Sequence, residues 1–319
     1  MSLALWVPSQ SSRLASEHFV HALKDLYFMN KDLKIAFFGG EPLGLPALQA
    51  LVSAGQTPSL VICNPDRKSG RGQQLQAPRI KTTALEYELP VFQPESYKDK
   101  ATFSVLTEAE WDLFVVVAYN FILPKWLLEL PKHGVVNVHP SLLPKLRGAS
   151  PIRSAILFDR RDEIGVSIML MDEEMDHGPL LMQAPLSLND WPLEGPFLDE
   201  MLGQIGGELL ATTILQWTAD TLTPAPQDHA AATYTKKFEK TDAELTLDPH
   251  NLPTGEGAHQ TLLKIYAFAG VADCFFIHNN ARVKIKAAAL TKDGQLQLLR
   301  VIPEGKAEMD FDDYLRINL

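Results

Sequence analysis

Short apolar runs alternate with helical patterns along the first two thirds of the chain. The runs at 34–38, 60–63, 91–93, 113–118 and 135–139 are rich in Val, Ile and Phe, and Pro or Gly residues flank several of them. Between them, apolar residues recur at helical spacing, as at 43–52, 81–88 and 124–130. This alternation predicts an α/β fold with a mostly parallel sheet that carries helices on both faces.

The pattern changes toward the C-terminus. Strands are expected at 166–171 and 180–183, and a closing amphipathic helix at 198–217. The segment 221–233 has two prolines and no periodicity, which is typical of a linker. Beyond it, one helix (257–267) and short strands (274–278, 282–287, 296–301) predict a small β-barrel or open sheet. The domain prediction is therefore 34–220, a linker at 221–233, and 234–319.

Residues 1–33 are expected to be an N-terminal extension. They lack the basic and apolar regions of a secretory signal, and acidic residues argue against a mitochondrial transit peptide. Met29 lies just before the first strand, so an upstream start or a terminal helix over 18–28 is the simple interpretation.

Composition restricts the class of protein without revealing a reaction. The 319 residues are 46% hydrophobic and 21% charged, with a net charge of −10, which disfavours both disorder and wholesale coating of nucleic acid. Two cysteines are too few for a disulfide framework and fit a reducing cytoplasm. The sequence contains no unbroken apolar stretch of membrane-spanning length, so no membrane partner is expected.

The strongest candidate for chemistry is the end of the run 135–139. Side chains alternate along a strand, so Asn137 and His139 share one face while Val136 and Val138 pack on the other. Pro140 helps to end the strand, which puts both polar residues near its carboxyl edge. Open α/β sheets bind ligands at that edge. An isolated Asn-x-His pair is also compatible with a strand end that merely satisfies loop backbone.

A second segment, the acidic loop 171–181, strengthens this candidate. It carries Asp172 and Asp176, with Gly178 allowing a tight return. Together with Asn137 and His139, a carboxylate completes a set suited to addition to a carbonyl: the amide donates to an oxyanion, and the histidine is oriented by the carboxylate. The spacing does not match a metal site, so no metal is expected.

Two other chemistries are disfavoured by the sequence. The turn at Gly39 and Gly40 lacks the spacing of a dinucleotide-binding fingerprint, because Glu41 occupies the second glycine position. No Ser or Cys lies in a nucleophile elbow, so covalent acyl transfer is not indicated.

Several longer motifs identify a resemblance. The run NVHPSLLPKLRGASPI, with DEEMDHG after it and VVVAYNFILP before it, resembles the 10-formyltetrahydrofolate-dependent formyltransferases. The stretches NPDRKSGRGQQLQAPRIKTTALEYELPVFQP, TYTKKFEKTDAEL and VIPEGKAEMDFDDYLR narrow the resemblance to the methionyl-tRNA formyltransferases. It runs from about residue 34 to the C-terminus and implies a Rossmann-like formyltransferase domain followed by an oligonucleotide-binding (OB-like) domain.

The resemblance also implies residue roles. The catalytic trio falls on Asn137, His139 and Asp176, and no metal is implied. Tetrahydrofolate contacts fall on two loops and the acidic turn: Ser141, Leu142, Leu143, Pro144, Phe121, Ile122, Leu123, Asp172 and Met175. The basic loop, Arg71 in particular, is implied to contact the acceptor stem of initiator tRNA.

The charge pattern agrees with a local contact to RNA. Residues 66–81 hold five basic side chains against one acidic side chain, and Arg67, Lys68 and Arg71 lie near two glycines. On the strand 282–287, Arg282, Lys284 and Lys286 share one face. The family pattern is abbreviated beyond the tail helix, however, and residues 235–319 hold 11 basic and 12 acidic side chains. Solvated loops and a charge-protected edge strand are the simpler interpretations of these features.

The expected function is formyl transfer from 10-formyltetrahydrofolate to methionine on initiator tRNA in translation initiation, by a cytoplasmic monomer. The alternatives are a formyltransferase for an amino sugar or other small amine, a hydrolase that releases formate, and a catalytically silent tRNA-binding homologue.

Overall fold

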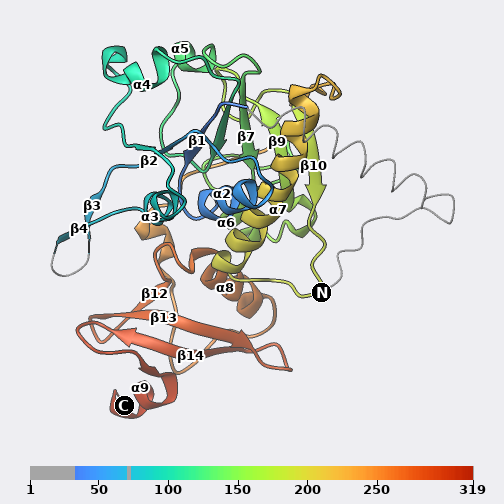
Figure 1. The fold of residues 1–319 in the computed structure, drawn as a ribbon. Coiled ribbons are helices and arrows are strands. Elements are labelled where there is room, and N and C mark those ends of the chain that lie inside the picture. Colours follow the sequence, from blue (N-terminus) through green and yellow to red (C-terminus); the bar gives the residue numbers. More distant parts are fainter. Residues whose placement is uncertain (1–32, 70–72, 319) are drawn as a thin grey trace.

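The computed structural model describes residues 33–69 and 73–318. A seven-stranded sheet forms its centre, in the order β10-β9-β7-β6-β1-β2-β5 (Figure 1). The pairs from β7 to β5 are parallel, whereas β9 is antiparallel to β7 and β10. The strands are β1 (Ile35–Gly39), β2 (Leu60–Cys63), β5 (Val91–Phe92), β6 (Leu113–Val117), β7 (Val135–His139), β9 (Gly165–Leu170) and β10 (Leu180–Pro185).

Helices cover both faces of this sheet. One face packs on the long helix α7 (Gly195–Thr218), on α2 (Gly44–Ser53) and on α3 (Arg79–Glu86), while α6 (Pro151–Leu157) lies next to α7. The other face packs on a smaller apolar cluster that includes Phe103, Leu106 and Leu127. These residues come from the turn η1 (Lys100–Phe103) and from the short helices α4 (Ser104–Thr107) and α5 (Lys125–Leu128).

Alternation along the strands distributes side chains between the two apolar clusters. In β7, Val136 and Val138 join the cluster under α7, and Val135 joins the opposite one. Asn137 and His139 therefore face the same side as Val135, as the period of two requires. Helix α7 approaches β7 closely and buries the face of the strand that carries Val138. A Cβ added to Gly206 of α7 would lie 2.8 Å from a Val138 methyl group.

A hairpin projects from the sheet domain between β2 and α3. Its strands are β3 (Arg67–Ser69) and β4 (Gln74–Gln76), and Figure 1 shows it extending on the side of the C-terminal lobe. At its base, the Lys81 ammonium contacts both carboxylate oxygens of Asp66 at 2.9 and 2.8 Å. This hydrogen bond, with one from Gln93, lowers the pKa of the Asp66 carboxyl.

The predicted linker has more order than its composition suggests. It contains a turn, η3 (His229–Ala231), and leads into β11 (Tyr234–Thr235), which pairs in parallel with β8 (Arg147–Gly148). The chain between the two lobes is therefore hydrogen-bonded to the loop that follows β7. Two further turns, η2 (Arg161–Glu163) and η4 (Lys240–Ala243), complete the connections.

The C-terminal lobe has one row of antiparallel strands, in the order β12-β13-β14-β15. Helix α8 packs on α6 and on β13, so a single apolar cluster continues from the sheet domain into this lobe. The elements are α8 (Gly255–Phe268), β12 (Phe275–His278), β13 (Ala281–Leu290), β14 (Leu296–Pro303), β15 (Met309–Asp310) and α9 (Phe311–Ile317).

The predicted fold class is confirmed, with an α/β domain followed by a small antiparallel β domain. In the described part of the chain, the four C-terminal strands form an open sheet rather than a closed barrel. The expected N-terminal extension, with Met29 and the helix over 18–28, lies almost entirely outside the described residues. Among residues 33–69 and 73–318, no helix combines the length and apolar character needed to cross a bilayer.

Candidate active site

Asn137 and His139 lie at the carboxyl end of β7, between β6 and β9. Asn137 is 9% exposed and His139 is 4% exposed. The Asn137 amide makes no hydrogen bond with any residue in the described ranges, which leaves its donor for a ligand. His139 is instead held from two sides by protein atoms.

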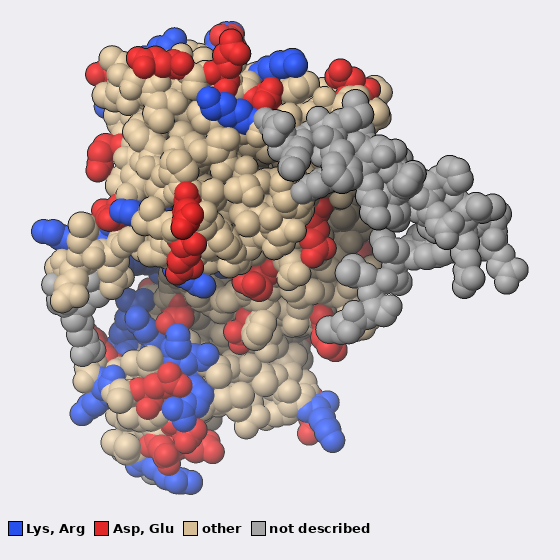
Figure 2. Space-filling model, viewed as in Figure 1, with Lys and Arg blue, Asp and Glu red and all other residues tan. Residues whose placement is uncertain are grey.

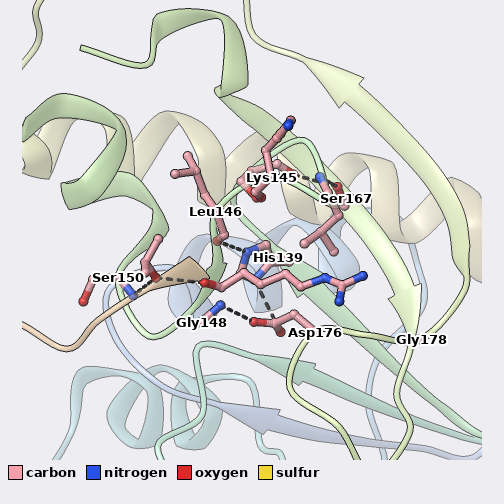
Figure 3. Close-up of polar contacts among 12 residues, drawn as sticks. His139, Lys145, Leu146, Gly148, Ser150, Ser167, Asp176 and Gly178 are labelled. Atoms are coloured by element: carbon pink, nitrogen blue, oxygen red, sulfur yellow. Dashed lines mark hydrogen bonds and ion pairs between the residues drawn. The ribbon is translucent and has the colours of Figure 1, made fainter. Parts of the chain in front are cut away.

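The loop after β7 and the acidic turn after β9 hold the imidazole of His139 (Figure 3). Its Nε2 lies 3.0 Å from the Leu146 carbonyl oxygen, and because a carbonyl only accepts, Nε2 carries the hydrogen and donates. Its Nδ1 lies 3.5 Å from Oδ1 of Asp176. The sequence prediction that a carboxylate of the acidic loop faces this histidine therefore has a geometric counterpart.

Asp176 is fixed by backbone as well as by the histidine. Its Oδ2 accepts a hydrogen bond from the Gly148 amide at 2.7 Å, and its side chain is 16% exposed. Its φ is +51°, in the left-handed region that a turn of this tightness demands. Gly178 does not have a left-handed φ, so its role differs from the tight return that the sequence suggested. A Cβ there would lie 1.9 Å from the Leu170 carbonyl oxygen.

Unusual backbone conformations gather around this group of residues. Ala118 at the end of β6, Leu146 and Asp176 have φ values of +51°, +58° and +51°. Left-handed non-glycine residues cost about 1 to 3 kcal/mol each and tend to occur at functional sites. At Leu146 this conformation accompanies the carbonyl that accepts from His139.

The second aspartate of the acidic loop belongs to a separate pair. Asp172 Oδ2 accepts from His177 Nδ1 at 2.7 Å, and the His177 ring stacks on His229 with centroids 4.0 Å apart. Within the described ranges, no group of three or more His, Cys, Asp or Glu side chains is arranged to hold a metal ion.

The candidate folate loops differ in how much surface they offer. Ser141 and Leu143 are buried, and the Leu143 amide and carbonyl are bonded to Ser167 and Gln183. Leu142 and Pro144 are partly exposed. The polar groups of Ser141 and Leu143 therefore form hydrogen bonds inside the protein that stabilise the loop.

Apolar side chains are more accessible around the acidic turn and the loop after β6. Ile122 is 87% exposed and Met175 is 59% exposed, whereas Leu123 is buried. The Phe121 ring packs against Tyr97 and Tyr119, 5.5 Å from each centroid. Exposed Ile and Met side chains on these two loops suit contact with the flat ring of a ligand.

The candidate tRNA residues fall in two places. Arg67 and Lys68 are exposed on β3, and Arg71 lies outside the described residues. On β13, Lys286 pairs with Asp273 at 2.9 Å, and the Arg282 guanidinium lies 3.6 Å from the centroid of the Phe275 ring. Figure 2 shows Lys and Arg side chains gathered where the C-terminal lobe faces the hairpin.

Glu41, in the glycine turn, bonds to the first amides of a neighbouring helix. Its Oε1 accepts hydrogen bonds from the backbone amides of Arg79 and Ile80, at 2.5 and 3.3 Å. These amides begin α3, a place where helices commonly bind anions. A side-chain carboxylate thus occupies the anion position at this helix.

Sequence reasoning missed two buried residues, Arg147 and Gln227. They lie between the loop that holds His139 and the turn that carries Asp176. Arg147 is 1% exposed, and Gln227 in the linker is 5% exposed. Arg147 lies inside the recognised motif, between Leu146 and Gly148, but its burial could not be read from the pattern. Gln227 gave no signal, because the linker has no periodicity.

Comparison with known proteins agrees with this geometry. Residues 33–189 match the family described as Formyl transferase. The methionyl-tRNA formyltransferase of Thermodesulfovibrio yellowstonii is 36% identical over 297 residues, which cover 88% of this chain and 94% of that protein. That of Synechococcus sp. (strain JA-2-3B'a(2-13)) is 43% identical over 219 residues, covering 67% of this chain and 66% of that protein.

Solved structures share the fold at low identity. A sugar N-formyltransferase from a Shewanella species has a TM-score of 0.59 at 19% identity and covers 82% of this chain and 99% of its own. HypX from Aquifex aeolicus, solved with tetrahydrofolic acid, has a TM-score of 0.59 at 15% identity and covers 89% of this chain and 47% of its own. By its sequence relatives, the chain belongs to the formyl transferase family, among the methionyl-tRNA formyltransferases.

Proposed function

We propose that this protein transfers the formyl group of 10-formyltetrahydrofolate to the α-amino group of methionine esterified to initiator tRNA, in the cytoplasm. The observation that carries the proposal is the convergence of Asn137, His139 and Asp176 at the carboxyl edge of the sheet, with His139 Nδ1 3.5 Å from the Asp176 carboxylate. The names of the sequence relatives supply methionyl-tRNA as the formyl acceptor. The folate donor comes from the family resemblance, and tetrahydrofolic acid is bound in one structural neighbour.

The reaction needs a base, an oxyanion donor and exact placement of two substrates. The neutral amine attacks the formyl carbon and forms a new C–N bond, giving a tetrahedral oxyanion. The bond from that carbon to folate N10 then breaks and returns the carbonyl. The attacking nitrogen loses one proton and N10 gains one, so the products are tetrahydrofolate and N-formylmethionyl-tRNA.

The three side chains have distinct roles in this scheme. The amide of Asn137, which has no hydrogen-bond partner among the described residues, donates to the oxyanion. The Nε2–H of His139 donates to the Leu146 carbonyl. The other ring nitrogen, Nδ1, faces Asp176 and is the one that exchanges protons. Asp176, held by the Gly148 amide, accepts the proton from the attacking amine directly or through water. Asn137 and His139 lie on a rigid strand and Asp176 on a fixed turn, which favours preorganisation.

The folate would lie over the exposed apolar side chains beside the trio. Ile122 and Met175 supply apolar surface for the pterin ring, with Asp172 and backbone of 121–123 at the rim. Leu142 and Pro144 offer the accessible part of the loop after β7. Ser141 and Leu143 support that loop from within, so their contribution to folate binding is indirect.

The RNA contact would be divided between the hairpin and β13. Arg67 and Lys68 are exposed and free of described ion pairs, and Arg71 follows them in the sequence outside the described residues. On β13, Lys284 and Arg282 have no described ion pair, with Arg282 lying over the Phe275 ring, whereas Lys286 is paired with Asp273. We therefore expect the hairpin to contribute more phosphate contacts than the C-terminal strand.

One assay tests the proposal and separates the alternatives. The protein is incubated with 10-formyltetrahydrofolate alone, with methionyl initiator tRNA, or with a nucleotide-linked amino sugar, and formylated product and free formate are measured. Formylmethionyl-tRNA as the main product is expected. Formate without acceptor would indicate a hydrolase, a formylated sugar would indicate the small-amine enzyme, and tRNA binding without turnover would indicate a silent homologue.

The RNA contact is tested by salt dependence. Replacing Arg67 and Lys68 by Ala should lower the slope of log affinity for tRNA against log salt by about 0.7 to 0.9 per lost phosphate contact. Arg316 is the control, because it is also exposed, lies on α9, and has its one ion pair within the described ranges with Asp313. Equal effects of the Arg316→Ala control and the hairpin variants would contradict the assignment.

A further inference from the structure

The loop that follows β7 holds both partners of the proposed catalytic pair within three consecutive residues. Leu146 offers its carbonyl to His139, and Gly148 offers its amide to Asp176. Between them lies Arg147, whose long side chain is buried inside the protein. Figure 3 shows Leu146 and Gly148 on either side of the His139 ring. Whatever fixes Arg147 therefore fixes the two groups that orient the catalytic pair.

The Arg147 guanidinium is held by uncharged groups. Its Nε and Nη2 donate to Oε1 of Gln227 at 3.2 and 2.6 Å, and its Nη1 donates to the Tyr234 hydroxyl at 3.3 Å. Its Nη2 also donates to His229 Nδ1 at 3.0 Å, so that nitrogen carries a lone pair. A buried cation is costly to leave unsatisfied, and these neutral acceptors come from the linker and from β11.

The amide nitrogen of the Gln227 side chain donates hydrogen bonds to the acidic turn. Its Nε2 donates to the Asp176 carbonyl oxygen at 3.0 Å and to the Gly178 carbonyl oxygen at 2.7 Å. Both hydrogens of the amide and both lone pairs of its oxygen are thereby engaged. One buried side chain from the linker ties the loop bearing Arg147 to the turn bearing Asp176.

The neighbouring linker residues reinforce this connection through backbone. The Leu146 amide donates to the Thr233 hydroxyl at 2.8 Å, and the Arg147 amide donates to the Thr233 carbonyl at 2.8 Å. The Thr235 hydroxyl donates to the Arg147 carbonyl and accepts from the Ser150 amide, both at 3.1 Å. The linker thus adds a short strand to the loop after β7.

We propose that Gln227 is a positioning residue for formyl transfer, which sets the separation of His139 and Asp176 by joining their supporting loops through Arg147. This inference rests on the proposed function, since it assumes that these two side chains act in the reaction. It makes the linker a part of the active site, where the sequence suggested only a connection between domains.

The test compares two buried glutamines. Gln227→Leu removes all four hydrogen bonds, and Gln56→Leu is the matched control. Gln56 is 7% exposed and donates to the Ala211 carbonyl at 2.7 Å, between α2 and α7 and away from the site. We expect Gln227→Leu to lower kcat about 10- to 100-fold, as displacements near 1 Å do, with the folate KM changed less than about threefold. Gln56→Leu should keep the kcat of the unaltered protein.

A spectroscopic measurement separates positioning from general loss of stability. In ¹⁵N-histidine spectra of folded protein, the Nδ1 signal of His139, identified by its loss in His139→Gln, should move in Gln227→Leu. It should stay in place in Gln56→Leu. Gln227→Glu is the second variant: it keeps an acceptor for Arg147 but sets a carboxylate oxygen against two carbonyls, so it should fold and remain slow.

The outcomes separate this inference from the proposed function. Gln227→Leu and Gln227→Glu both within twofold of the unaltered kcat, with an unmoved His139 signal, would overturn the inference. If Gln227→Leu does not fold, Gln227→Glu decides in the same way. If His139→Ala itself retained full turnover, the proposed catalytic assignment would fail, whereas an inactive His139→Ala beside fully active Gln227 variants would reject only the positioning role.

Discussion

A single methyl group at Gly178 should disable the enzyme without unfolding it. Gly178 follows Asp176 by two residues, and a Cβ built there lies 1.9 Å from the carbonyl oxygen and 3.0 Å from the carbonyl carbon of Leu170. Both clashing atoms belong to backbone, so no side chain can rotate away. Leu170 ends β9, and its amide is bonded to the Pro179 carbonyl at 2.9 Å.

The magnitude follows from the size of the overlap. Ordinary contact begins near 3.4 Å, so the Gly178→Ala variant must separate these segments by about 1.5 Å. Because β9 is hydrogen-bonded to β7 and β10 within the sheet, the acidic turn is the part that moves. A shift of that size breaks the 2.7 Å contact between Asp176 and the Gly148 amide. Displacements near 1 Å cost about 10²-fold in rate, and overpacking costs about 1 to 3 kcal/mol of stability.

The assay measures kcat at saturating folate and tRNA, together with the melting temperature. Gly257→Ala is the control, because it lies in α8 and its Cβ meets nothing nearer than Pro253 Cβ at 3.7 Å. The control should keep full kcat and lose no stability. A folded Gly178→Ala protein with kcat within threefold of the unaltered protein would refute the reasoning that the turn is sterically fixed.

Two further predictions concern buried groups away from the site. Burial raises the pKa of the Cys63 thiol to about 11 and that of Cys274 to about 12, so both should resist a thiol reagent at pH 8 until urea unfolds the protein. Since unfolded thiols ionise near pH 9, the melting temperature should fall as pH rises from 9 toward 11; a flat profile, or rapid labelling of native protein, would contradict this. Asp199→Ala leaves the partly buried Arg153 guanidinium without its buried bidentate partner on α7, and urea unfolding should show a loss of about 3 to 5 kcal/mol; a loss under about 1 kcal/mol would show that the pair is dispensable.

The sheet was predictable because burial on both faces leaves a clear trace in the sequence. The ranges of β2 and β7 agree with the predicted strands, and helix α7 extends only a few residues beyond its predicted range. The hairpin β3–β4 and the short helix α6 escaped prediction. These elements are too short to show a periodic pattern. The exposed residues of β4 also give no clear apolar signal.

The candidate site was predictable in part, for a different reason. Period-two alternation alone placed Asn137 and His139 on one face. Pairing of His139 with Asp176 rather than Asp172 depends on a left-handed φ at Asp176, which the spacing cannot specify. The roles of Arg147 and Gln227 depend on contacts across 80 residues of sequence. Such contacts follow from the path of the linker over the site, and no local pattern encodes that path.

The most direct measurement is single-turnover formyl transfer by His139→Ala, Asp176→Ala and the double variant, with folate and tRNA saturating. If the two side chains act as one unit, each single variant should be slower by about 10² to 10⁴, and the double variant should be no slower than the worse single variant. Losses that multiply in the double variant, or a His139→Ala protein that still transfers formyl at nearly the unaltered rate, would contradict the account.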